Sequence, residues 1–209
     1  MAAQRRRSLT DDLLSDLIRA EDDGDRLSTD ELRMLVAGLL MAGTDTTRNQ
    51  LAASVQILCD HPDLWVLLAD HPELASNAVE ETMRHSPVAF GALRTAVDDI
   101  EVAGIFIPAG TMLVANTAAA NRDSAVYGDP DRLDITRAGA SAIQTFGAGM
   151  HYCLGANLAR LELAEALAVM TRRMPNARRT GPAPWKPLTA LSGPAALPIE
   201  FDPEIRGYP

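Results

Sequence analysis

The sequence predicts a mainly α-helical fold with small β-sheets (an α+β fold), which we expect to form a single domain over residues 1–209. Apolar residues recur at helical spacing over long stretches of the chain. Between residues 96 and 115, and again near the C-terminus, short apolar runs are separated by Gly and Pro, which is typical of strands and turns. The length and the 47% content of hydrophobic residues suffice for one sizeable core.

A short helix and the start of a long one are predicted at the N-terminal end. The short helix covers residues 11–20 and is followed by the polar run 22–25. Ser28 and Glu31 then form a capping box, with Ser at the N-cap and Glu at the third helical position. The capping box predicts that a helix begins here.

The helix that begins at this box is expected to be long. Its apolar residues keep a three- and four-residue spacing from Leu32 to Leu58, and Pro62 ends it. Residues 35–43 are apolar on nearly all sides, so we expect the middle of the helix to be buried.

Shorter elements fill the rest of the chain. A long irregular stretch inside a compact domain is uncommon unless it has a function or surrounds a ligand. In chain order we expect helices at 62–69 and 73–85, a hairpin over 96–107 turned at Ala103-Gly104, a strand at 111–115, an irregular stretch at 121–145, a helix at 156–173, and strands at 188–191 and 197–201.

Composition and charge exclude several functions. The net charge of -9 and the 4% content of aromatic residues argue against nucleic-acid binding. No apolar run approaches the roughly 18 residues that a membrane span needs, and the charged N-terminus lacks the apolar core of a signal peptide. We therefore expect a cytoplasmic protein that binds no nucleic acid and no membrane. The two cysteines make no disulfide framework, and Cys59 is expected in the core.

The most informative segment is a glycine-rich loop that contains Cys153. The cysteine follows a Gly-x-Gly turn and precedes a predicted helix, so free N–H groups and the helix dipole favour its thiolate. A thiolate on such a loop can form a single bond from the protein to a heme iron. For a single cysteine, a buried structural role is the common alternative.

The long helix contains its poorest helix formers at its centre, in the segment Ala42-Gly43-Thr44-Asp45-Thr46-Thr47. Local conflicts of this kind tend to mark functional sites. Asp45 and Thr46 offer an acid and an alcohol for proton transfer. Helix packing through small residues explains the segment equally well when it is considered alone.

The cysteine loop resembles the heme-binding loop of the cytochrome P450 family at every defined position of the pattern FGxGxHxCxG. The resemblance implies heme b (iron protoporphyrin IX) as the cofactor, with Cys153 as the ligand to the iron and His151 bound to a propionate. The implied fold is the C-terminal half of the cytochrome P450 fold, with a long central helix, an ExxR helix and a heme-loop helix. The loop residues implied at the cofactor are Phe146, Gly147, Gly149, His151, Cys153 and Gly155.

The centre of the long helix resembles the A-G-x-[DE]-T-T segment on the distal helix of the same family. By this resemblance Ala42 and Gly43 lie against the cofactor. Asp45 and Thr46 deliver protons while dioxygen is reduced.

Glu81 and Arg84 would form an ordinary salt bridge on an exposed helix. With the Ser-Pro that follows, they resemble the family's ExxR motif, which implies a buried ionic network completed by an arginine of the irregular stretch. Arg132 is the best match for that arginine, and Arg137 is the second candidate.

Three further assignments depend only on the resemblance. Arg94 matches an arginine that binds a heme propionate. Two segments match regions that shape the substrate pocket: the first comprises Val88, Ala89, Phe90 and Gly91, and the second runs from Ser192 to Ala196.

The resemblance covers nearly the whole chain but only the C-terminal half of the family's fold, so the single domain is truncated. We expect that, without the N-terminal half, residues 35–43 expose an apolar patch that favours self-association or a second subunit.

Two functions of different classes follow. The first is a heme-thiolate monooxygenase, or its heme-binding half, that oxidises a small apolar molecule. Its electrons would come from a separate ferredoxin or flavoprotein, because the sequence has no nucleotide-binding glycine motif. The second is a truncated, non-oxidising homologue that stabilises a partner or catalyses non-redox chemistry in the pocket.

Overall fold

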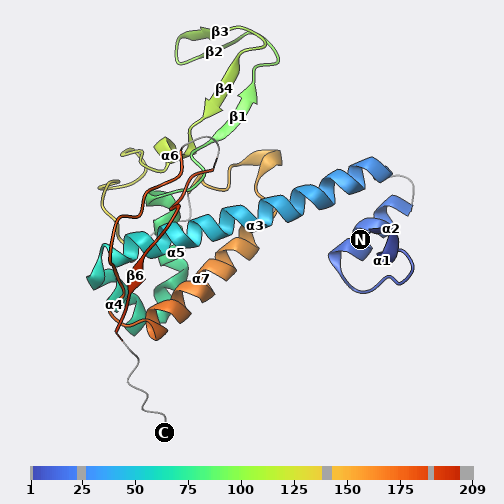
Figure 1. Ribbon diagram of the computed structural model, residues 1–209. Coiled ribbons are helices and arrows are strands. Elements are labelled where there is room, and N and C mark those ends of the chain that lie inside the picture. Colours follow the sequence, from blue (N-terminus) through green and yellow to red (C-terminus); the bar gives the residue numbers. More distant parts are fainter. Residues whose placement is uncertain (1, 23–26, 138–142, 188–190, 203–209) are drawn as a thin grey trace. The chain divides into compact units, whose positions relative to one another are not determined.

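The computed structural model describes residues 2–22, 27–137, 143–187 and 191–202 (Figure 1). The chain divides into two compact units, residues 1–45 and residues 46–209. The long helix α3 (Thr29–Cys59) contributes its first half to one unit and its second half to the other. The predicted fold class, mainly α with small sheets, is confirmed.

The first unit contains α1 (Ala2–Arg5), α2 (Leu13–Asp22) and the start of α3, and α1 contacts α2. The predicted capping box is present at the start of α3. The backbone N–H of Ser28 donates to the Glu31 carboxylate at 2.7 Å, and the N–H of Glu31 donates to Ser28 Oγ at 3.3 Å. The two residues thus satisfy two N–H groups that have no partner within the helix.

The prediction that residues 35–43 are buried is wrong for this chain. Met41 is 76% exposed and Leu40 is 58% exposed, and Met34, one turn before the segment, is 73% exposed. Exposed apolar side chains within 35–43, which the sequence also predicts, are thus found at Leu40 and Met41.

The second unit has a helical core. It contains the end of α3, α4 (Pro62–Asp70), the 3-10 helix η1 (Pro72–Leu74), α5 (Ala75–His85) and α7 (Ala156–Arg173). Helix α7 lies against both α4 and α5 (Figure 1). The indole N–H of the buried Trp65 donates to the carbonyl of Met174 at 3.0 Å, which ties α4 to the end of α7. Large buried side chains at the centre include Leu58, Trp65, Leu68, Val79, Leu163 and Leu167.

Three small antiparallel sheets accompany the helices. Strand β1 (Ala92–Thr95) pairs with β4 (Met112–Ala115), and β2 (Ile100–Val102) pairs with β3 (Ile105–Ile107). The predicted turn between β2 and β3 is confirmed: Ala103 and Gly104 have φ values of 51° and 79°, as a tight hairpin requires. The hairpin begins at residue 100 instead of 96, and β1 was not predicted.

The third sheet pairs β5 (Arg178–Arg179) with β6 (Ile199–Glu200). β6 lies within the strand predicted at 197–201. The strand predicted at 188–191 falls largely outside the described residues, and the partner of β6 is β5 instead.

The chain between the sheets and α7 is mostly irregular. Its described residues include the short helix α6 (Thr117–Ala120) and the 3-10 helix η3 (Gly149–His151). The described residues of the stretch 121–145 contain no helix or strand, as predicted. Within the described part of the chain, no helix combines the length and the apolar character needed to cross a bilayer.

Candidate functional site

The cysteine loop is built on two turns that only glycine accommodates without strain. Gly147 and Gly149 have φ values of 72° and 67°, in the left-handed region. The backbone N–H of Cys153 donates to the carbonyl of Phe146 at 3.0 Å, which closes the loop between them. Cys153 is a free thiol and is exposed.

Space is open beside this loop. A Cβ added at Gly149 or Gly155 would meet no other group within 4 Å. The backbone can therefore approach a flat ligand at these two positions, which are among the six loop residues expected at the cofactor.

The two cysteines differ in their chemistry. Cys59 is buried in the helical core, and its burial raises the pKa of the thiol to about 11. Cys59 therefore stays protonated at neutral pH.

A cavity of about 140 Å³ connects the loop with the long helix. Thr46 of α3 and Cys153 both line it, although they are far apart in the sequence. The remaining lining residues are mostly apolar: Thr47, Gln50, Met83, Val88, Ala89, Thr145, Phe146, Ala159 and Leu163.

Several residues predicted at the site lie on the surface. Asp45, which precedes Thr46 on α3, is exposed, and so are Ala42 and Gly43. His151 is exposed in η3. Arg94 is exposed on β1, where its guanidinium donates to the carbonyl of the adjacent Leu93 at 2.8 Å.

The first predicted pocket segment divides into two parts. Val88 and Ala89 line the cavity, whereas Phe90 and Gly91 are half-buried beyond it. A Cβ at Gly91 would lie only 2.5 Å from the carbonyl oxygen of Ala115 on β4. Gly91 is thus required for the close approach of two backbone segments.

The second predicted pocket segment lies beside the first. The backbone N–H of Ser192 donates to the carbonyl of Val88 at 2.8 Å, and Ser192 Oγ donates to the carbonyl of Lys186 at the same distance.

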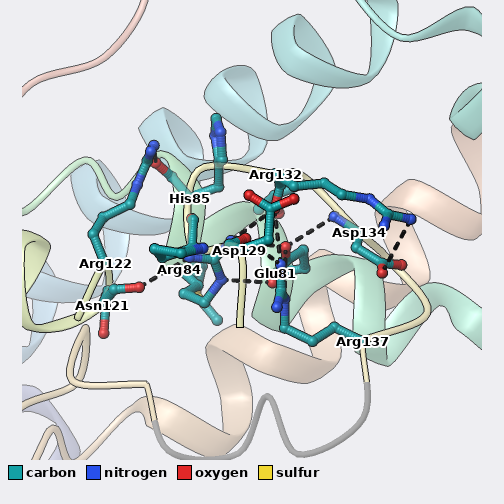
Figure 2. A network of polar contacts seen from close by, with 12 residues as sticks. Glu81, Arg84, His85, Asn121, Arg122, Asp129, Arg132, Asp134 and Arg137 are labelled. Atoms are coloured by element: carbon teal, nitrogen blue, oxygen red, sulfur yellow. Dashed lines mark hydrogen bonds and ion pairs between the residues drawn. The ribbon is translucent and has the colours of Figure 1, made fainter. Parts of the chain in front are cut away.

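Behind the cavity, Glu81 and Arg84 form a buried pair on α5 (Figure 2). Arg84 Nε donates to Glu81 Oε2 at 2.7 Å and Nη2 donates to Oε1 at 2.9 Å, a two-pronged contact. The other donors of Arg84 reach the carbonyls of Asn121, Pro130 and Arg132 at 2.9, 2.7 and 3.1 Å. The hydrogen bonds to Glu81 raise the pKa of Arg84 above its usual value. All the donors of this buried cation are satisfied.

The arginine that completes the network is Arg137, and the assignment of this role to Arg132 is wrong. Arg137 Nε donates to Glu81 Oε1 at 3.3 Å, and its side chain is 13% exposed. The side chain of Arg132 is 66% exposed and pairs with Asp134 at 3.5 Å (Figure 2). The turn that contains Arg132 directs the carbonyl of this residue inward, so only its backbone joins the network.

Glu81 accepts hydrogen bonds both from α5 and from the irregular stretch. Besides the two arginines, the backbone N–H of Asp134 donates to Glu81 Oε1 at 2.9 Å. The irregular stretch is therefore fixed to α5 through one carboxylate and one guanidinium.

A second charged pair near the cysteine loop was not predicted. Arg160 on α7 contacts Glu80, the residue that precedes Glu81 on α5. The sequence gives little indication of this pair, because an arginine and a glutamate on two different helices have no characteristic spacing along the chain.

The fold and the loop together define a class of protein, and comparison with known proteins identifies it. The sequence model of the family described as Cytochrome P450 matches residues 1–65 and 69–174. The chain therefore belongs to the cytochrome P450 family, whose members contain heme and in general receive electrons from a redox partner.

Among relatives, luteothin monooxygenase of Streptomyces thioluteus is 44% identical over 192 residues, which are 91% of this chain and 47% of the relative. Nocardicin C N-oxygenase of Nocardia uniformis subsp. tsuyamanensis is 43% identical, over 96% of this chain and 51% of the relative. The solved structure of cytochrome P450 CREJ superposes on 96% of this chain with a TM-score of 0.90 and 32% sequence identity. The matched part is 51% of the chain in that structure. The chain thus spans about half the length of the relatives it matches.

Proposed function

We propose that this chain is the heme-binding half of a heme-thiolate monooxygenase that oxidises a small apolar molecule. The observation that carries the proposal is that Cys153 of the glycine loop and Thr46 of the long helix line one mostly apolar cavity. The residues present fit heme b, since an accessible free thiol lies next to glycines with open space on their outer side.

Each residue has a role in this proposal. The Cys153 sulfur binds the iron, while the loop glycines let the backbone approach the porphyrin. His151 and Arg94 bind propionates by charge-assisted hydrogen bonds. When bound, heme b supplies the iron at which dioxygen is reduced. Thr46 and Asp45 supply protons during that reduction, and Val88 and Ala89 form the wall of the substrate pocket.

The redox partner is proposed to be a separate ferredoxin or flavoprotein. A polypeptide corresponding to the other half of the family's length, or a second copy of this chain, would complete the pocket.

A second function is supported by the exposed face of α3. Met34, Leu40 and Met41 form an apolar patch suited to association with another protein. A non-oxidising homologue that stabilises a partner would need this face and would not need Cys153 in contact with iron.

An absorption spectrum separates the two functions. The purified chain is mixed with hemin, alone and with a polypeptide that completes the family's length, then reduced and exposed to carbon monoxide. The first function requires the strongly red-shifted Soret band of a thiolate-ligated heme. Failure to bind hemin in either mixture would support the second function.

Thr46→Ala tests the proton role. We expect the thiolate spectrum to be retained, because Thr46 lies on α3 and not on the cysteine loop. The yield of oxidised product per electron consumed should fall roughly tenfold or more, the effect of losing a positioned proton donor.

The measurement compares reductant consumption with product formation for a substrate that shifts the heme spectrum. Thr44→Ala is the matched control, because Thr44 Oγ1 donates to the carbonyl of Leu40 at 2.7 Å in the same helix and does not belong to the cavity lining. Equal yields in the wild type and Thr46→Ala would refute the role.

A further inference from the structure

The guanidinium of Arg160 lies where three segments of the chain meet. On α5, Glu80 accepts from Arg160 Nε at 2.5 Å and from Nη2 at 3.5 Å. From the cysteine loop, the hydroxyl of Tyr152 accepts from Nη1 at 3.0 Å. The guanidinium carbon also lies 4.4 Å from the ring centroid of Phe146, at the other end of the loop.

Both loop residues held by Arg160 control the position of Cys153. Tyr152 directly precedes Cys153, and the carbonyl of Phe146 accepts the backbone N–H of Cys153 at 3.0 Å. The two aromatic rings also lie near each other, with centroids 6.4 Å apart and planes at 58°. One cation therefore contacts both the residue before Cys153 and the residue whose carbonyl accepts the Cys153 N–H.

We infer that Arg160 is a positioning residue that holds the Cys153 loop in its ligand-binding conformation, with Glu80 as its counter-ion. Arg160 acts through Phe146 and Tyr152 and does not itself need to contact the cofactor.

The chemistry of this position favours arginine over lysine. A guanidinium is planar, so it can lie over an aromatic face while its edge donates to a carboxylate and to a hydroxyl. A lysine ammonium could pair with Glu80, but it could not make the stacked contact with Phe146 in the same geometry. The hydrogen bonds to Glu80 raise the pKa of Arg160, so the cation persists at any physiological pH.

The pair is distinct from the buried network on the same helix. Glu80 and Glu81 are neighbours on α5, yet Glu80 pairs with α7 and Glu81 with the irregular stretch. Changes at Arg160 can therefore be tested without removing a partner of Arg84.

Amide hydrogen exchange on the full chain without heme tests the inference. The variants are Arg160→Lys, which keeps the charge, and Tyr152→Phe, which removes one hydroxyl. Arg173→Lys, an exposed arginine in the last turn of α7, is the matched control. In Arg160→Lys we expect the amide of Cys153 to exchange roughly tenfold faster, the size of one lost charge-assisted hydrogen bond, with α4 unchanged. Tyr152→Phe should give a smaller increase, and Arg173→Lys none.

Two results would overturn the inference. Unchanged exchange at Cys153 in Arg160→Lys would mean that the contacts of the guanidinium with Tyr152 and Phe146 do not hold the loop. An equal increase throughout α4 and α5 would mean a general loss of stability. Hemin added to the same variants gives a second readout, in which Arg160→Lys should lower the fraction with the thiolate band relative to Arg173→Lys. Only this last arm depends on the proposed function: if the wild type binds no hemin even with the completing polypeptide, that function fails, and the exchange data still decide the role of Arg160.

Discussion

Replacing Arg84 by alanine is expected to lower the free energy of unfolding by about 3–5 kcal/mol, the usual cost of removing one partner from a buried ion pair. The side chains of Arg84 and Glu81 are 0% and 1% exposed, so the substitution leaves a carboxylate with little access to water. Three backbone carbonyls of the irregular stretch lose a donor as well, although that of Arg132 still accepts from Arg137. Urea unfolding followed by circular dichroism measures the change.

The controls use the two arginines that the sequence offered for this network, of which Arg132 was the first choice and Arg137 the second. Arg132→Ala should cost less than about 1 kcal/mol, because its side chain makes only an exposed ion pair. Arg137→Ala should fall between Arg132→Ala and Arg84→Ala, since Arg137 contacts Glu81 but leaves the main pair intact. If Arg84→Ala does not fold, Arg84→Lys retains the charge and should still be less stable than Arg132→Ala. An equal cost for Arg132→Ala and Arg137→Ala would contradict the network.

Replacing Cys153 by alanine is expected to abolish the thiolate Soret band entirely, since no other residue that lines the cavity contains sulfur except the thioether of Met83. The substitution removes one sulfur atom from an exposed side chain, so the stability of the fold should barely change. Spectra of the reduced chain with hemin and carbon monoxide measure the effect.

Cys59→Ala is the matched control and should retain the band, because Cys59 is buried in the helical core. Alkylation with iodoacetamide gives a readout that needs no heme. At neutral pH we expect Cys153 to react and Cys59 to be protected by burial and by its pKa of about 11. A thiolate band that persists in Cys153→Ala would exclude Cys153 as the ligand.

Features set by local pattern could be predicted from the sequence. The capping box at Ser28 begins α3 as expected, and the helix predicted at 156–173 has the same bounds as α7. The turn at Ala103-Gly104 was also predicted, because few sequences tolerate two consecutive residues with positive φ. Each of these features depends on residues close together in the chain.

Features set by distant contacts could not be predicted. The choice between Arg132 and Arg137 depends on how the irregular stretch turns, and no periodicity describes such a stretch. Strand β5 is two arginines long and exists only through its pairing with β6. The exposure of Met41 depends on which other segments pack against α3, and the sequence of α3 alone does not specify them. The contact between Arg160 and Glu80 likewise joins two helices that are far apart in the sequence.

The close approach of Gly91 to Ala115 has a practical consequence for anyone who wishes to reshape the cavity beside it. A randomised library could sample Val88 and Ala89, because both residues line the cavity. Any larger residue at position 91 would instead push β4 away and disturb its pairing with β1. Diversity is therefore best concentrated on the first two positions of this segment, with the glycine held constant.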